Sequence, residues 1–171
     1  MRIFVTNLGK YNNGELEGQW LQLPCSDLQI QTALKVIGIG EGYEEYFITD
    51  YENDYGLKVG EYTNIHLLNE IAESIDNLDK SKKTLLHAVI ELDCNSLSQV
   101  KDILDELSNY MLYPNITNDE ELGRFYIYEI ERHNHETITA LADYIDFEAY
   151  GRDIRINAKG DFTSYGWAEK Q

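Results

Sequence analysis

Carboxylates dominate the side chains with which this chain could do chemistry. Its 171 residues include 31 Asp and Glu against 14 Lys and Arg, which gives a formal net charge of −17. Asp50, Glu52 and Asp54 alternate along the chain, and Glu61 stands at the twelfth position, a spacing that resembles the ligand loop of an EF-hand. The required glycine comes one residue late, and a strand-like segment stands where an incoming helix is needed. A calcium-binding or acidic regulatory module that binds another basic protein is therefore the second hypothesis.

Histidines and cysteines indicate chemistry less strongly. His133, His135 and Glu136 could supply metal ligands, but alternate side chains just before a helix cap are more often solvated. Cys25 and Cys94 have no C-x-x-C pairing, so we expect free thiols. The sequence has no G-x-S-x-G elbow and no phosphate-binding glycine loop. An enzyme is the third hypothesis, and we expect no catalytic residue, no cofactor and no metal.

The carboxylates have a second possible use, as substitutes for the phosphates of DNA. Duplex DNA carries one charge per about 1.7 Å of axis, whereas alternate strand residues lie about 6.6 Å apart and helical neighbours about 5 to 6 Å apart. At the charge density of DNA, the carboxylates would cover on the order of 50 Å, or about 15 base pairs, and a dimer about twice that. Such a surface repels nucleic acid and attracts the basic groove of proteins that bind it. The residues expected to form it are Glu41, Glu44, Glu45, Asp50, Glu52, Asp54, Glu61, Glu70, Glu73, Asp76, Asp102, Asp105, Glu106, Asp119, Glu120, Glu121, Glu129 and Glu131.

The acids fall into two zones. Residues 41–79 hold eleven carboxylates and one lysine, and residues 102–148 hold twelve carboxylates and two arginines. Residues 80–101 between them have a small positive excess. Any single pair of acids is also compatible with the ordinary solvated face of a helix or strand. Two separate zones favour an extended molecule with two charged surfaces.

The composition is typical of a folded cytoplasmic protein. Hydrophobic residues make up 43% of the chain and aromatic residues 12%, which is enough for a core. No apolar run approaches the roughly 18 to 20 residues of a membrane span, and the N-terminus lacks the features of a signal peptide. We therefore expect no contact with membranes.

The residue pattern predicts an α+β fold, an elongated chain of small domains. Residues 1–61 predict an antiparallel sheet with one inserted helix, and residues 62–112 a helical middle domain with Thr63 or Asn64, and Ser96, as N-caps. The predicted strands are 2–7, 16–23 and 44–51, with turn residues at 9–14. A capping box at Ser26 begins the inserted helix, and Gly38 follows its end.

Residues 113–171 predict a C-terminal α+β domain. Residues 118–121 predict an acidic helix N-terminus, where carboxylates are favoured, and 125–130 (FYIYEI) predict a strand. Asn134 should cap a helix that buries Ile138, Leu141, Ala142 and Ile145. A closing hairpin should then pair 154–157 with 162–165 around a turn at 158–160.

Three stretches resemble the ArdA-type antirestriction proteins, which are DNA mimics of conjugative plasmids and transposons. They are NLGKYNNGELEGQWLQLP (7–24), YEEYFITDYE (43–52) and LADYIDFEAYGRDIRINAKGDFTSYG (141–166). The resemblance runs nearly end to end and is weakest over 78–115. It implies a homodimer of three-domain monomers that is shaped like bent B-form DNA. Such a dimer would occupy the DNA groove of type I restriction-modification enzymes and block them without chemistry.

The resemblance also implies a dimer interface. Residues 141–153 look like the short antirestriction motif of the family, a region associated with dimerisation. The residues that the resemblance places there are Leu141, Tyr144, Ile145, Asp146, Phe147, Glu148, Tyr150, Arg152 and Asp153.

Overall fold

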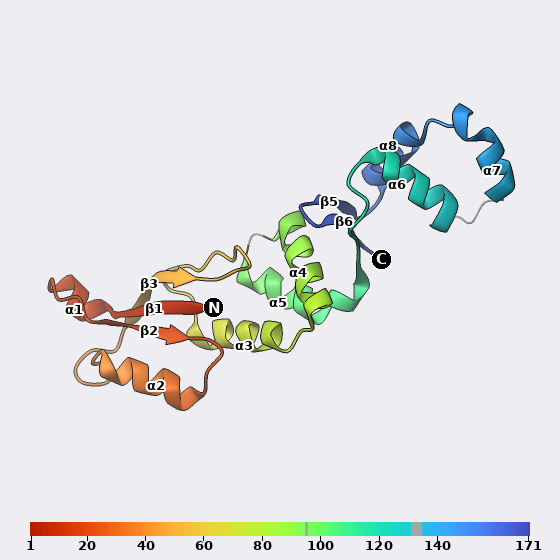
Figure 1. Ribbon diagram of the computed structural model, residues 1–171. Helices are drawn as coiled ribbons and strands as arrows, with labels where there is room; N and C mark the ends of the chain where they lie inside the picture. Colours follow the sequence, from red (N-terminus) through yellow and green to blue (C-terminus); the bar gives the residue numbers. More distant parts are fainter. Residues whose placement is uncertain (95, 131–134) are drawn as a thin grey trace. The chain divides into compact units, whose positions relative to one another are not determined.

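The computed structural model describes residues 1–94, 96–130 and 135–171, which form two compact units (Figure 1). Unit 1 is Met1–Asp79 with the described part of Asn95–Leu104, and unit 2 is Lys80–Cys94 with Asp105–Gln171. Each unit combines helices with a three-stranded antiparallel sheet, which confirms the α+β class. The division into three domains stays a prediction.

Unit 1 begins with a sheet of order β2-β1-β3. Its strands, β1 (Arg2–Asn7), β2 (Gly18–Gln22) and β3 (Tyr46–Glu52), begin and end within two residues of the predicted bounds. The turn predicted after β1 is instead a short helix, α1 (Leu8–Asn12). The Asn7 side chain accepts a hydrogen bond from the Lys10 amide at 3.0 Å and so caps this single helical turn.

Two helices cover the inner face of this sheet, and α2 is visible alongside it in Figure 1. The predicted capping box begins α2 (Asp27–Val36), because Ser26 and Gln29 each bond the other's backbone amide. Asn64 caps α3 (Ile65–Asp76), and Ser96 caps α5 (Leu97–Asp105). The core that joins α2 and α3 to the sheet is Ile3, Val5, Leu21, Leu23, Ile30, Ala33, Ile37, Ile48, Ile65, Leu68 and Ala72.

Unit 2 contains the second sheet, of order β4-β6-β5, with α4 (Lys80–Asp93) packed against it. Its strands are β4 (Tyr110–Tyr113), β5 (Gly160–Thr163) and β6 (Gly166–Lys170). The helical structure predicted for residues 62–112 is wrong at its end: a 3-10 turn at Leu107–Asn109 leads into β4, whose backbone pairs with β6. The predicted closing hairpin pairs the wrong segments, because β5 pairs with β6 rather than with 154–157.

The remaining elements of unit 2 are helical where two strands were predicted. Asn118 caps α6 (Asp119–Phe125), as predicted, but the chain continues as a π-helix over Tyr126–Ile130. Residues 154–157 belong to α8 (Phe147–Asn157). Both segments are rich in aromatic or β-branched residues, whose strand preference depends on context. Here Tyr126 and Ile154 pack against the core around Trp167, and this packing favours the helical conformation.

The segment before α8 also differs from its prediction. Helix α7 (His135–Leu141) and the 3-10 turn Ala142–Tyr144 contain no buried residue, so the predicted inward stripe is wrong. Leu141 is 48% exposed. The predicted cap Asn134 lies outside the described residues.

Helices α6 and α8 cross at two glycines. A Cβ added to Gly151 would lie 1.8 Å from the Asp119 carbonyl oxygen, and one added to Gly123 would lie 2.0 Å from that of Phe147. The two backbones are therefore in direct contact, which no other residue type would allow.

Candidate functional site

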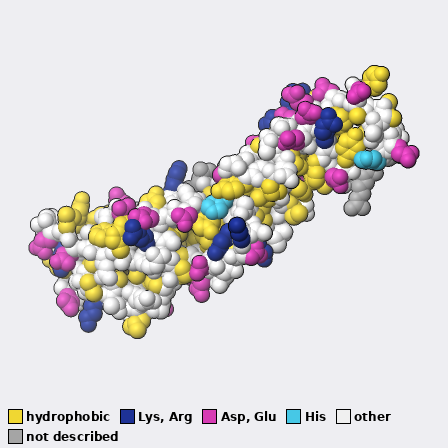
Figure 2. Space-filling view, viewed as in Figure 1, with side chains coloured by type: hydrophobic (Ala, Val, Ile, Leu, Met, Phe, Trp, Pro, Cys, Tyr) yellow, Lys and Arg dark blue, Asp and Glu magenta, His cyan; other side chains and the backbone are white. Residues whose placement is uncertain are grey.

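The acidic residues expected from the sequence lie at the surface of both units. All of those that the structure describes are exposed except Asp119, which is half-buried. Glu131 lies outside the described residues. Figure 2 shows Asp and Glu side chains on the visible face, with Lys and Arg side chains among them. A carboxylate surface is thus available to a partner on each unit.

The helical spacing of the acids is confirmed. Glu70, Glu73 and Asp76 are exposed on α3, whereas Leu68 and Ile75 of the same helix are buried. Carboxylates three residues apart on one helix lie about 5 to 6 Å apart. Asp102 and Asp105 are exposed in the same way on α5.

The strand spacing of the acids is wrong in two places. Strand β3 ends at Glu52, so Asp54 lies in the loop that follows and does not continue a track from Asp50. Glu129 lies in the π-helix rather than in the predicted strand. The acidic surface is therefore less regular than the sequence predicted.

Several of the predicted carboxylates form ion pairs within the described chain, which the spacing of the acids does not predict. The partner cations come from distant elements or from one helical turn away: Glu52 with Arg2, Glu70 with Lys101, Glu106 with Lys170, Asp119 with Arg155 and Glu120 with Arg124. Hydrogen bonds from these cations lower the pKa of Glu52, Glu70 and Asp119. Such pairs present less net charge to a partner protein than an unpaired carboxylate would.

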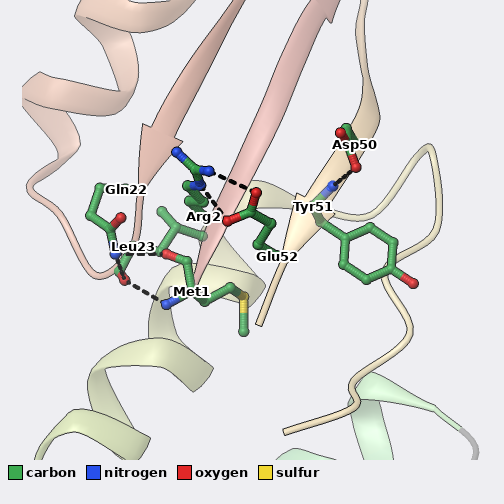
Figure 3. A network of polar contacts seen from close by, with 7 residues as sticks. All are labelled: Met1, Arg2, Gln22, Leu23, Asp50, Tyr51 and Glu52. Carbon is green, nitrogen blue, oxygen red and sulfur yellow. Dashed lines mark hydrogen bonds and ion pairs between the residues drawn. The ribbon is translucent and has the colours of Figure 1, made fainter. Parts of the chain in front are cut away.

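The Arg2–Glu52 pair is held by two hydrogen bonds (Figure 3). Arg2 Nε and Nη2 donate to the two carboxylate oxygens of Glu52 at 2.6 and 2.7 Å. The guanidinium also lies 4.4 Å from the centre of the Trp20 ring. One arginine is thus held by a carboxylate and an aromatic face together.

The calcium-loop hypothesis finds no support in the geometry of its candidate ligands. Both oxygens of Glu52 bind Arg2, and Asp50 accepts a hydrogen bond from the Tyr51 amide at 2.8 Å. Asn53 organises the loop instead, because its side chain bonds the backbone of Tyr55 and Leu57. Among the described residues, no three His, Cys, Asp or Glu side chains form a metal-binding group. His133 lies outside those residues, so its proposed pairing with His135 is not described.

The predicted interface residues 141–153 divide into exposed and buried members. Tyr144 is 87% exposed and Leu141 48%. Phe147 is only 4% exposed, and the Arg124 guanidinium lies 4.1 Å from its ring centre. Asp146 caps α8 by accepting a hydrogen bond from the Ala149 amide at 2.9 Å. Ile145 and Tyr150 are partly exposed, and Glu148, Arg152 and Asp153 are exposed.

A cavity of about 410 Å³ opens on the outer face of the unit 1 sheet. Strand alternation places Phe4 and Thr6 on the face opposite the buried Ile3 and Val5. Of the lining residues, only Glu61 was expected from the sequence to have a role. The others come together through strand pairing, and the lining as a whole is Phe4, Thr6, Tyr11, Leu16, Gly18, Phe47, Thr49 and Glu61.

A family model for antirestriction protein (ArdA) matches residues 3–169. The chain belongs to the ArdA antirestriction family. The match spans both units and all of the acids discussed above, and membership implies an antirestriction function. A search of curated proteins found no match.

The resemblance of this chain to the ArdA family, inferred from three stretches of sequence, is thereby confirmed. In the described part of this ArdA family member, no helix is both long and apolar enough to cross a membrane.

Proposed function

We propose that the chain inhibits a type I restriction-modification enzyme by occupying its DNA-binding groove as an acidic mimic of DNA. The observation that supports this most directly is the exposure of the carboxylates: sixteen of the seventeen described acids in the predicted set are at the surface. No chemical step is needed, because occupation of the groove is sufficient for inhibition. We place this activity in the cytoplasm, where restriction enzymes meet incoming DNA.

The inhibition is electrostatic and collective. A net charge of −17 attracts a basic groove from a distance, and no single carboxylate supplies a large part of that attraction. Single neutralisations such as Glu70→Gln or Asp102→Asn should therefore weaken inhibition less than about threefold. The ion pair of Glu70 with Lys101 strengthens this expectation for Glu70, because that carboxylate is already compensated.

We also propose that the inhibitor is a homodimer joined through residues 141–153. Tyr144 and Leu141 support this, since both are exposed and stand three residues apart within this stretch, so that a partner copy could bury them together. A dimer would double the length of the acidic surface available to the enzyme.

Competition binding tests the proposal. A type I restriction-modification enzyme is bound to fluorescently labelled duplex DNA, and the protein is titrated at several fixed salt concentrations. We expect displacement of the DNA at near-stoichiometric dimer and steep weakening with salt, because the contact is between charges in water. An absence of displacement at large excess, or a flat response to salt, would contradict the proposed mechanism.

A further inference from the structure

The outer face of the unit 1 sheet carries an arginine held between a carboxylate and an aromatic ring. Arg2 of β1 lies over Trp20 of β2, with 4.4 Å between the guanidinium carbon and the ring centre. The same guanidinium bonds both oxygens of Glu52 on β3. Here the chain binds its own cation with one residue from each neighbouring strand.

The cavity further along β1 repeats these components, and none of the described residues that line it is a lysine or arginine. Its aromatic walls include Phe4 and the edge-to-face pair of Tyr11 and Phe47, whose ring centres are 5.1 Å apart. Its carboxylate is Glu61, which forms no ion pair in the described part of the chain. Phe4 also packs edge-to-face against Trp20, with 5.3 Å between the ring centres, so the cavity adjoins the site that holds Arg2.

The lining of this cavity is held in place by the backbone of the sheet. The Ile48 amide donates to the Glu61 carbonyl at 2.7 Å, which fixes Glu61 beside β3. Thr6 and Thr49 form a hydroxyl pair at 2.8 Å, and their oxygens can accept further hydrogen bonds. At Gly18 an added Cβ would lie 2.4 Å from the Phe4 ring. The Phe4 ring can therefore occupy this position only because residue 18 has no side chain.

We propose that this cavity receives an arginine side chain from the basic DNA-binding groove of the inhibited enzyme. A guanidinium is planar, stacks on aromatic faces and donates to carboxylates and hydroxyls at once, which matches walls of Phe and Tyr with Glu61 at the side. The inference rests on the proposed function for the identity of the partner. It adds one specific contact to an otherwise diffuse charge attraction.

The first test uses a small arginine analogue and needs no restriction enzyme. Nα-acetyl-arginine amide is titrated into the ¹⁵N-labelled full chain, and the backbone amides of Thr6, Gly18 and Thr49 are followed by NMR. We expect saturable shifts at these amides in the millimolar range, and none with the uncharged citrulline analogue. Equal shifts with both analogues, or shifts spread over all acidic loops, would overturn the proposal.

The second test compares two substitutions that change the net charge equally. Glu61→Gln removes the carboxylate of the cavity, and Glu73→Gln removes an exposed carboxylate of α3 in the same unit. We expect Glu61→Gln to weaken DNA displacement about tenfold and Glu73→Gln less than about threefold, because only the first removes the partner of an inserted guanidinium. Equal small effects would overturn the cavity proposal and leave the collective mimicry intact. If the wild-type chain displaces no DNA, the proposed function fails, while the analogue titration still decides whether the cavity binds a guanidinium.

Discussion

Acidic side chains of the same type have different local environments in this molecule. Glu73 is exposed on its helix, whereas Asp119 is half-buried and bonded by both Nε and Nη2 of Arg155 at 2.8 and 3.2 Å. The first can meet a partner's cation, and the second joins α6 to α8. Treating all carboxylates as equivalent phosphate substitutes would therefore mix residues that bind a partner with residues that hold the fold.

The Asp119–Arg155 pair makes a pH-dependent contribution to stability. The hydrogen bond from Arg155 lowers the pKa of Asp119 below its ordinary value of 3.8. A lowered folded-state pKa gives stabilisation that is fully present above the unfolded-state pKa and is lost as pH falls through the folded-state value. We expect Asp119→Asn to reduce the free energy of unfolding by about 1 kcal/mol at neutral pH, with the difference from wild type vanishing at pH well below 3.8.

Urea unfolding at a series of pH values measures this difference. The control is Glu120→Gln, which breaks the more exposed i, i+4 pair with Arg124 and should cost about 0.3 to 0.5 kcal/mol. A constant difference between Asp119→Asn and wild type down to low pH would show that the carboxylate charge is not responsible.

At the scale of the elements, the crossing of α6 and α8 determines the architecture of the C-terminal part of unit 2. We expect Gly151→Ala to destabilise unit 2 by about 3 kcal/mol or more, because the new methyl group would overlap the Asp119 carbonyl and force the two helices apart. Thermal unfolding followed by circular dichroism measures the loss. Ser74→Ala, at an exposed position of α3, is the matched control and should change stability by less than about 0.5 kcal/mol. A fully stable Gly151→Ala variant would mean that the helices do not cross at this point.

The difference between local and long-range contacts explains which elements the sequence could predict. The capping box at Ser26 and the strand β1 depend on neighbouring residues or on simple alternation, so their signals are local. The helical state of Tyr126 is supported by its hydroxyl bond to Glu169, 43 residues away, at 2.6 Å. A contact between residues so far apart produces no periodic pattern in the sequence. The aromatic and β-branched residues of 125–130 therefore predict a strand.

The candidate site was predictable to a similar extent. The exposed acids of α3 follow from helical periodicity alone. The pairing of Glu52 with Arg2, 50 residues apart, follows only from the register of β1 against β3, and so does most of the cavity lining. Charges can be counted from a sequence, but the cation that pairs with a given carboxylate cannot be identified from it.

The segment from α7 to α8 provides a prediction about assembly. We expect the double variant Leu141→Asp with Tyr144→Asp to weaken the proposed homodimer at least tenfold, because it places charge on exposed apolar side chains that a partner copy would bury. Sedimentation equilibrium measures the dissociation constant. Leu28→Asp changes a 72% exposed leucine of α2 and should leave association unchanged. A monomeric wild-type protein at micromolar concentration would contradict the proposed interface.

At the scale of the whole molecule, inhibition should depend on the sum of the charges. We expect the six-fold variant with Glu41, Glu44, Glu45 and Glu73 changed to Gln, and Asp50 and Asp54 changed to Asn, to inhibit at least about 100-fold more weakly at moderate salt. The cavity residue Glu61 is left unchanged so that the two proposals stay separable. Competition binding measures the loss, and circular dichroism checks the fold. Full inhibition by this variant would refute charge mimicry.

The placement of the two tryptophans makes the two units spectroscopically distinguishable. Trp20 lies in unit 1, partly exposed beneath the Arg2 guanidinium, and Trp167 lies in unit 2, fully buried with its Nε1 donating to Glu169 at 3.0 Å. Replacing either one with Phe would leave a single fluorophore whose emission reports on one unit. Quenching by iodide should then be strong for Trp20 and weak for Trp167. Denaturant titrations of the two variants would reveal whether the units unfold together or one at a time.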